Sequence, residues 1–166
     1  MAMTQGALLE SVPKGLFIDG AWRDASDGAT LPVDDPATGK ILAHVASATV
    51  ADGKAALDAA VAAQRDWART APRDRGEILR RAYEAIIART DDFALLMTLE
   101  MGKPLAEARG EVVYGAEFFR WFSEEAVRIH GRYAVAPNGA TRLMTMKQPI
   151  GPTLMITPWN FPLAMA

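Results

Sequence analysis

The most informative absence in this chain of 166 residues is cysteine, which does not occur at all. Disulfides, thiolate metal ligands and thiol nucleophiles are therefore excluded within these residues. Histidine is nearly absent as well, with His44 and His130 as its two instances. Neither histidine has partner ligands at the spacing that zinc sites show, so the sequence predicts no metal site.

Several common signatures are also missing. No two glycines are separated by a single residue, so the Gly-x-Gly-x-x-Gly dinucleotide turn is absent, and so is the Gly-Lys-Ser/Thr phosphate loop. No apolar run approaches the length of a membrane span, and residues 1–15 do not resemble a secretory signal. The net charge of −2 gives no case for nucleic acid or an anionic membrane as partner. We therefore expect a cytoplasmic protein that binds neither.

What is present is the composition of a folded globular domain, with 50% hydrophobic and 23% charged residues. Residues 16–46 have the pattern of strands and turns. Asp19-Gly20 lies between short apolar pieces in Phe17–Trp22, which predicts a β-hairpin. Ile41–Val45 is a predicted strand.

Residues 49–131 have the pattern of helices. Thr49 and Asp52 have the form of a capping box, and Pro72 suits the first turn of a second helix. Asp91 or Asp92 is the predicted cap of a third, short helix.

That third helix is expected to end near Gly102. The fourth and longest helix is then predicted to run from Pro104 to Gly131. Its apolar positions recur at steps of three and four: Leu105, Ala108, Val112, Gly115, Phe119, Phe122, Ala126 and Ile129. This spacing suits either a coiled coil or a seam buried in a larger domain. Gly115 and the wide aromatics Phe118 and Trp121 favour the second.

The last part of the chain has an extended pattern. Residues 133–148 have no helical stripe, and Leu154–Ile156 is a continuous apolar run of the kind found in strands buried on both faces. Helices followed by such a strand predict an α/β layer protein whose sheet is incomplete within these residues. The apolar end of the chain, up to Ala166, leads us to expect a chain that has been cut short.

One segment suggests chemistry. In Ile156–Pro162, Asn160 stands between Trp159 and Phe161 and is bounded by prolines, just after the predicted strand. Ligands in open α/β sheets bind at the carboxyl ends of strands, and a fixed amide N–H is a typical donor to an oxyanion. A structural asparagine in a proline-bounded turn explains the same residues about equally well.

The same segment resembles the Pro-Trp-Asn-Phe-Pro motif of the aldehyde dehydrogenase superfamily. Other matches follow in the family's order: Phe17–Trp22 is similar to its opening hairpin, Asp35–Gly39 to its Asn-Pro-Ala-Thr-Gly turn, and Leu99–Pro104 to its Leu-Glu-x-Gly-Lys-Pro segment. Asp35 stands where the family usually has Asn. The likeness extends from about Leu16 to Ala166, and within the superfamily it is greatest to succinate-semialdehyde dehydrogenases.

The resemblance implies a fold and a domain division. The expected fold is α/β, an incomplete Rossmann-like cofactor-binding domain that is helix-rich and carries an N-terminal β-hairpin. Residues 1–130 and 150–166 would form part of that domain. Residues 131–149 would form the start of an oligomerisation (bridging) arm, which implies a dimer or tetramer for the whole enzyme.

The resemblance also implies roles for individual residues. Asn160 would hold the oxyanion that forms when a cysteine thiolate attacks the aldehyde, and Phe161 would border the substrate tunnel. The cofactor, NAD or NADP, would be lined by Ile156, Thr157, Pro158 and Trp159. The family's cysteine, its glutamate base and its lysine for the cofactor ribose all follow the Pro-Trp-Asn-Phe-Pro motif. We therefore expect the chain by itself to be inactive.

Three functions remain compatible with the sequence. The first is the amino-terminal part of an enzyme that oxidises succinate semialdehyde to succinate. The second is a truncated, non-catalytic module that joins intact subunits through residues 131–149. The third is part of another semialdehyde or betaine-aldehyde dehydrogenase, because those enzymes share some of the motifs.

Overall fold

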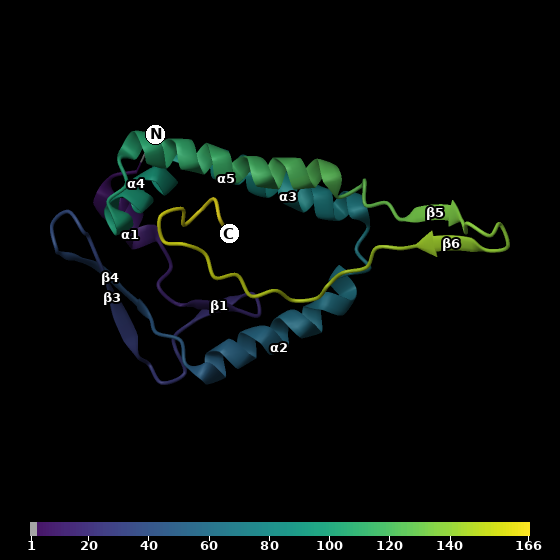
Figure 1. Ribbon diagram of the computed structural model, residues 1–166. Coiled ribbons are helices and arrows are strands. Elements are labelled where there is room, and N and C mark those ends of the chain that lie inside the picture. The colour runs from purple at the N-terminus through teal and green to yellow at the C-terminus, as the bar shows by residue number, and fades with distance from the viewer. Residues whose placement is uncertain (1–2) are drawn as a thin grey trace.

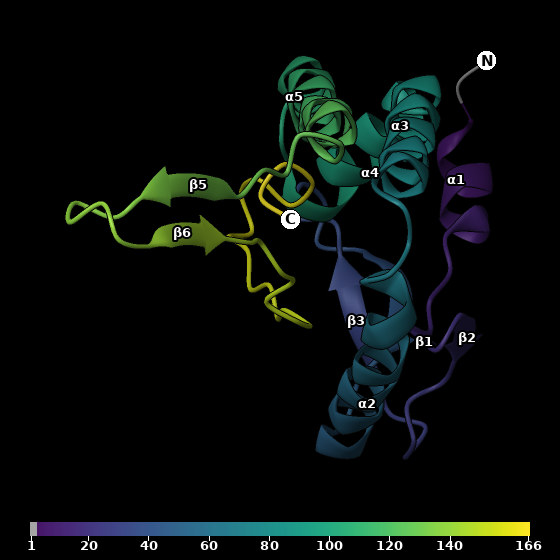
Figure 2. The ribbon, with the colours of Figure 1, turned by 90° about the vertical axis from the view of Figure 1, so that its right-hand side faces the viewer.

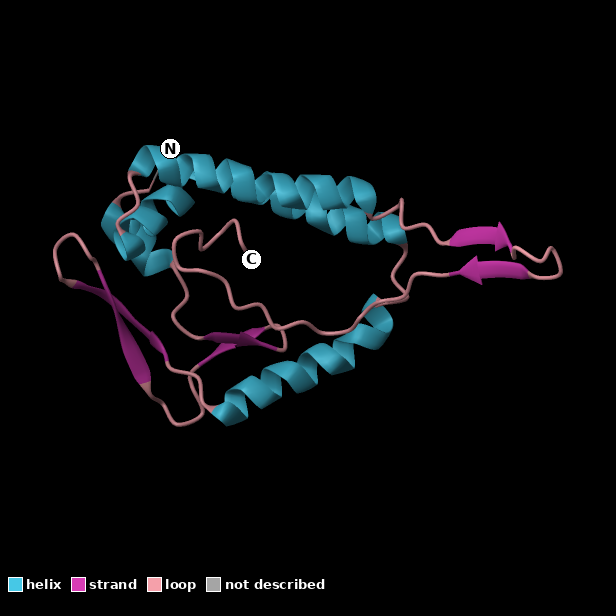
Figure 3. Ribbon diagram, in the orientation of Figure 1, coloured by secondary structure: helices cyan, strands magenta, loops and turns pink. Residues whose placement is uncertain are grey.

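The computed structural model describes residues 3–166 (Figure 1). The elements are α1 (Gln5–Ser11), β1 (Leu16–Ile18), β2 (Ala21–Arg23), β3 (Thr30–Asp34), β4 (Ile41–Ala46), α2 (Val50–Trp67), α3 (Pro72–Ala88), α4 (Thr90–Met101), α5 (Leu105–Glu125), β5 (Arg132–Val135) and β6 (Arg142–Thr145). The strands form three separate two-stranded antiparallel sheets (Figure 3). No helix in the described part of the chain is long and apolar enough to cross a membrane.

The predicted hairpin at Phe17–Trp22 is confirmed as β1–β2. Asp19 and Gly20 join the strands with φ angles of 54° and 75°, which are the two positive values that a type I′ turn requires. Phe17 and Trp22 face each other across the strands with ring centroids 5.1 Å apart. The predicted strand at Ile41–Val45 is confirmed as β4, which pairs with β3.

Helix α2 begins with the predicted capping box. The Thr49 side chain accepts a hydrogen bond from the Asp52 backbone N–H at 3.2 Å, and the Asp52 carboxylate accepts one from the Thr49 N–H at 2.9 Å. Asp52 also accepts the Ser26 N–H at 3.1 Å, which ties the helix to the preceding loop. Backbone donors from Thr49 and then Ser26 lower the pKa of Asp52 to about 2.

The apolar face of α2, in contrast to its cap, has few contacts with the rest of the chain. Leu57 and Val61 are 55% and 56% exposed. Figures 1 and 2 both show α2 standing apart from the layer that α3, α4 and α5 form. The cap therefore fixes the start of this helix, and α2 also contacts β1.

The predicted start of α3 at Pro72 is confirmed, and so is the end of α4 at Gly102, which has a φ of 79°. The prediction that Asp91 or Asp92 caps α4 is wrong. The N-cap is Arg89, without a side-chain hydrogen bond, because α4 follows α3 almost without interruption. Both aspartates lie inside the first turn of α4, where their negative charges interact favourably with the positive end of the helix dipole.

Helix α5 begins after Pro104, as predicted, but it ends at Glu125 and not at Gly131. Gly131 is required for another reason. A Cβ at this position would lie 1.9 Å from the Thr145 carbonyl oxygen, so the glycine allows β6 to approach the chain before β5.

The core lies where α4 and α5 meet. Its buried members are Ala94, Met97, Ala108 and Val112. Helix α3 packs beside α5 (Figure 1), and Gly76 allows a close contact because a Cβ there would lie 2.7 Å from the Ser123 carbonyl oxygen. The predicted apolar seam of α5 is therefore buried in its first half.

The second half of that seam is only partly covered, since Ala126 is 9% exposed whereas Phe122 and Ile129 are 55% and 60% exposed. The same holds for the end of the chain. The prediction of a buried strand at Leu154–Ile156 is wrong, because these residues form neither strand nor helix and their side chains are 84%, 62% and 88% exposed. A strand buried on both faces needs neighbouring strands and covering helices, and within the described residues none lies against this run.

Residues 133–148 are extended, as predicted, in the sense that they contain β6 and all of β5 except Arg132. Figure 1 shows the β5–β6 hairpin projecting away from the helices. Its turn contains Asn138-Gly139, with a φ of 72° at Gly139. Asn-Gly is a strong hairpin signal that the sequence interpretation did not use.

Candidate functional site

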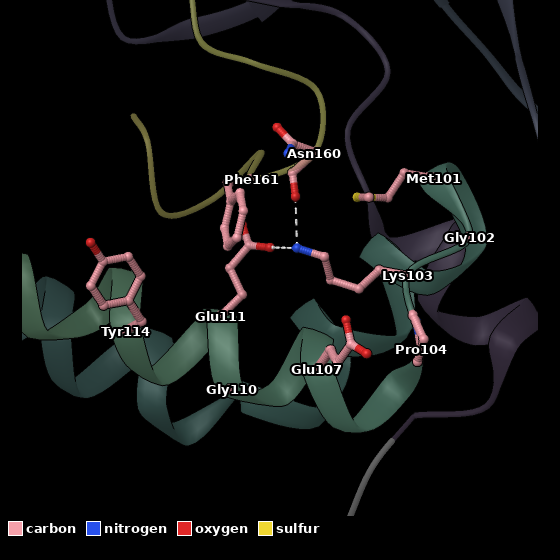
Figure 4. A pocket seen from close by; sticks show the side chains of 10 residues that line it. All are labelled: Met101, Gly102, Lys103, Pro104, Glu107, Gly110, Glu111, Tyr114, Asn160 and Phe161. Atoms are coloured by element: carbon pink, nitrogen blue, oxygen red, sulfur yellow. Dashed lines mark hydrogen bonds and ion pairs between the residues drawn. The ribbon is translucent and has the colours of Figure 1, made fainter.

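The segment with the predicted site residues returns from the β5–β6 hairpin to the amino-terminal half of α5. Where it arrives, a cavity of about 620 Å³ opens between the α4–α5 connection and the end of the chain (Figure 4). Its lining residues are Met101, Gly102, Lys103, Pro104, Glu107, Gly110, Glu111, Tyr114, Asn160 and Phe161. Two of the predicted site residues, Asn160 and Phe161, thus face a cavity built by helices that precede them by about 50 residues.

The most deeply buried charged group at this cavity is the carboxylate of Glu111, a residue that is 3% exposed. One oxygen, Oε1, accepts the backbone N–H groups of Leu163 at 3.0 Å and Ala164 at 3.2 Å. The other, Oε2, is paired with Lys103. A buried carboxylate is tolerated only when it is paired and hydrogen-bonded, and Glu111 meets both conditions.

Lys103 connects the same carboxylate to the predicted site. Its Nζ donates a hydrogen bond to the Asn160 carbonyl oxygen at 2.7 Å, and it lies 4.1 Å from the centroid of the Phe161 ring. The lysine side chain is 9% exposed. Figure 4 shows the ammonium between the Glu111 carboxylate and the Asn160 carbonyl. Because the Lys103 ammonium is largely removed from water, its hydrogen bond to the Asn160 carbonyl and its cation–π contact with the Phe161 ring are both strengthened.

Apolar packing holds the same turn. Leu163 packs against the core cluster, and Ala164 is 6% exposed. Gly115 makes this approach possible, because a Cβ there would lie 2.2 Å from Leu163 Cδ2 and 3.1 Å from Ala164 Cα. The turn from Asn160 to Ala164, which we call the docked turn, is therefore fixed on α5 by polar and apolar contacts together.

The structure separates the remaining predicted residues from this cavity. The proposed cofactor residues Ile156, Thr157, Pro158 and Trp159 do not line it. Ile156 and Trp159 are 88% and 78% exposed, whereas Thr157 is half-buried. Among the described residues, no group of three or more His, Cys, Asp or Glu side chains could hold a metal ion.

Sequence reasoning missed Lys103 and Glu111 as site residues. A signal for Glu111 was available, because it falls three residues after Ala108 and directly before Val112, on the apolar side of α5. A charge in such a place is a buried-pair candidate. Lys103 was noted as part of Leu99–Pro104, but its long-range contact with Asn160 has no local signature.

Comparison with known proteins covers nearly the whole chain, including the site. The model of the aldehyde dehydrogenase family matches residues 22–166. A succinate-semialdehyde dehydrogenase from Paenarthrobacter nicotinovorans is 68% identical over 126 residues, which are 76% of this chain and 28% of that protein. A glutarate-semialdehyde dehydrogenase from Pseudomonas aeruginosa is 46% identical over 149 residues, or 90% of this chain and 31% of that protein.

A solved structure agrees with these matches. The crystal structure of a succinate-semialdehyde dehydrogenase from Burkholderia pseudomallei, 42% identical, superimposes with a TM-score of 0.91 over 99% of this chain and 34% of that one. The chain belongs to the aldehyde dehydrogenase family. It spans about 30% of the length of the relatives that it matches, and its fold is a part of the α/β fold of these enzymes.

Proposed function

We propose that the chain is the amino-terminal part of an NAD(P)-dependent enzyme that oxidises succinate semialdehyde to succinate. The observation that carries this proposal is the 68% identity to a succinate-semialdehyde dehydrogenase over three quarters of the chain. The cavity supports the proposal, because Asn160 and Phe161 of the motif line it together with residues of the α4–α5 region.

In this function Asn160 donates its side-chain amide N–H to the oxyanion that forms when a thiolate adds to the aldehyde carbon. The thiolate comes from a cysteine outside the 166 residues, and a glutamate from outside activates the water that releases the acid. Phe161 borders the path of the substrate. Lys103 and Pro162 hold the backbone on either side of Phe161.

A nicotinamide dinucleotide, when bound, would accept the hydride from the substrate carbon. Ile156, Thr157, Pro158 and Trp159 would lie along it and exclude water from one of its faces. NADP⁺ occurs in the name of an Escherichia coli relative that is 45% identical, and NAD⁺ in a complex of a betaine aldehyde dehydrogenase from Staphylococcus aureus. Either cofactor is therefore proposed, with no preference assigned.

The β5–β6 hairpin is proposed as the start of an oligomerisation arm. Its exposed side chains include Tyr133 at 69%, Met144 at 69% and Leu143 at 53%. Exposed apolar groups on a projecting hairpin favour contact with another subunit. The whole enzyme is accordingly proposed to be a dimer or tetramer, and its expected location is the cytoplasm.

The direct test is an assay of the protein encoded by the complete reading frame that contains this sequence. We expect succinate semialdehyde to give NADH or NADPH with the highest kcat/KM among succinate semialdehyde, glutarate semialdehyde and betaine aldehyde. A clear preference for glutarate semialdehyde would select the alternative that the Pseudomonas relative supports. No reduction of either cofactor with any aldehyde would reject the proposed function.

The 166 residues expressed alone are expected to form no NADH or NADPH, because the thiolate step has no cysteine within them. Pure chain of confirmed mass that reduced either cofactor with an aldehyde would contradict this expectation. A genuine stop codon at this point, with a stable fragment that joins intact subunits, would favour the non-catalytic module instead.

A further inference from the structure

Glu111 differs from the other acidic residues of α5 in its surroundings. Glu107, one helical turn before it, lines the same cavity and is exposed. Glu117 and Glu125 make exposed ion pairs with arginines on their own helix or just after it. Glu111 is buried, and both of its oxygens contact groups far away along the chain or outside the helix. Its carboxylate therefore joins α5 to Lys103 and to the docked turn.

The contacts of the pair are distributed along the whole docked turn. Lys103 reaches the backbone of Asn160 and the ring of Phe161, before Pro162. Glu111 reaches the N–H groups of Leu163 and Ala164, after Pro162. The proline stiffens the middle, so two fixed ends define the path of the entire turn.

Little else within the described residues holds this part of the chain. The preceding residues Leu154–Ile156 belong to no strand and are exposed, so they do not anchor Asn160 from the other side. The backbone position of Asn160 thus depends on Lys103, Glu111 and the packing of Leu163 against Gly115.

We propose that Lys103 and Glu111 are positioning residues, which fix the docked turn on α5 and thereby set where the Asn160 amide lies. The structural part of this proposal stands on the contacts alone. Its catalytic part rests on the proposed function, because only there does the Asn160 amide face an oxyanion. Misplacement of such a donor by about 1 Å costs on the order of a hundredfold in rate.

The structural part is tested by hydrogen exchange on the 166-residue chain. Glu111→Ala is expected to speed exchange of the Leu163 and Ala164 amides at least about tenfold, because it removes their acceptor. Glu107→Ala is the matched control and should leave both amides within about twofold of the original rate. Glu111→Gln keeps a carbonyl acceptor and should retain more protection than Glu111→Ala. Unchanged exchange at Leu163 and Ala164 in Glu111→Ala would overturn the proposal.

If Glu111→Ala unfolds the chain, as circular dichroism would show, Lys103→Met decides the matter. This variant keeps the acceptor for Leu163 and Ala164 but frees Asn160. It should speed exchange of the Met165 amide, which donates to the Phe161 carbonyl oxygen, at least about tenfold, while the α4–α5 core stays protected. Equal exchange with and without Lys103 would then overturn the proposal.

The catalytic part is tested in the complete enzyme. Lys103→Met should lower kcat per titrated active site at least about tenfold and leave the cofactor KM within about twofold, with partial rescue in Lys103→Arg. Unchanged kcat in Lys103→Met would reject the catalytic role, even if the exchange results stand. An original enzyme without activity would instead reject the proposed function and leave the exchange results as the test of positioning.

Discussion

Two apolar stretches near the end of the chain have opposite environments. Leu154–Ile156 is 84%, 62% and 88% exposed, whereas Leu163 packs on the core and Ala164 is 6% exposed. Both are strongly apolar, and a proline lies one or two residues before each. The difference lies in their partners, because α5 offers Gly115 and Glu111 to the second stretch. Burial is therefore decided by the presence of a complementary surface and not by hydrophobicity alone.

The largest effect is expected where the docked turn meets the core. Met97→Ala should lower the free energy of unfolding by about 2–5 kcal/mol, since it leaves a cavity among Ala94, Ala108 and Val112. Urea denaturation followed by circular dichroism measures this quantity. A loss below about 0.5 kcal/mol would mean that this cluster does not stabilise the fold.

A second prediction concerns the role of Asn160 in catalysis. In the complete enzyme, Asn160→Ala should lower kcat on the order of a hundredfold, because it removes an oxyanion donor worth about 3 kcal/mol. Gln148→Ala, which removes an exposed amide from the preceding segment, should leave kcat within about twofold. Equal kcat in the Asn160 variant and the original enzyme, with chemistry rate-limiting, would remove Asn160 from this role.

A third prediction concerns α2, the helix that is held mainly at its cap. Thr49→Ala should destabilise the chain by about 1 kcal/mol, because the first turn loses its side-chain acceptor. The melting temperature of the variant and of the original chain at neutral pH gives the test. Identical melting temperatures would show that the capping box contributes nothing.

The same cap predicts a pH dependence. The pKa of Asp52 is lowered from 3.8 to about 2 in the folded chain, so its contribution to stability is complete above about pH 4 and is lost as the pH falls through about 2. The stability difference between the original chain and Asp52→Asn should shrink over this window. A difference that stays constant from pH 5 to about 2 would contradict the assignment.

The smallest effect is expected in the exposed stretch. Leu154→Ala should change the free energy of unfolding by less than about 0.5 kcal/mol, because the side chain is 84% exposed and loses little contact. A loss comparable to that of Met97→Ala would show that Leu154–Ile156 is covered in solution.

The features that the sequence predicted correctly depend on neighbouring residues. The Asp19-Gly20 turn, the Thr49–Asp52 capping box, the start of α3 at Pro72 and the end of α4 at Gly102 each follow from backbone geometry within a few residues. Local rules suffice there, because the groups that satisfy one another are close in sequence.

Two of the features that were predicted wrongly depend on distant partners, whereas the cap expected at Asp91 or Asp92 failed locally, because α4 follows α3 almost without interruption. The strand at Leu154–Ile156 requires neighbours that the described residues do not place beside it. The end expected at Gly131 followed an apolar spacing that continues to Ile129, although the helix stops at Glu125 and the glycine instead makes room for β6.

The candidate site shows the same limit. Asn160 and Phe161 could be singled out from their motif, and both line the cavity. The apolar side of α5 marked Glu111 as a buried charge, but the contacts that place Glu111 and Lys103 at the site join residues 50 or more positions apart.

The most direct test of this account is residue-resolved amide exchange in the unmodified chain. Leu163 and Ala164 donate to a buried carboxylate, whereas Leu154–Ile156 lies in no helix or strand and is exposed. We predict exchange at Leu163 and Ala164 at least about tenfold slower than at Leu154–Ile156, relative to unstructured peptides. Equal exchange in the two stretches would contradict the docked turn, and with it the claim that α5 holds Asn160 in place.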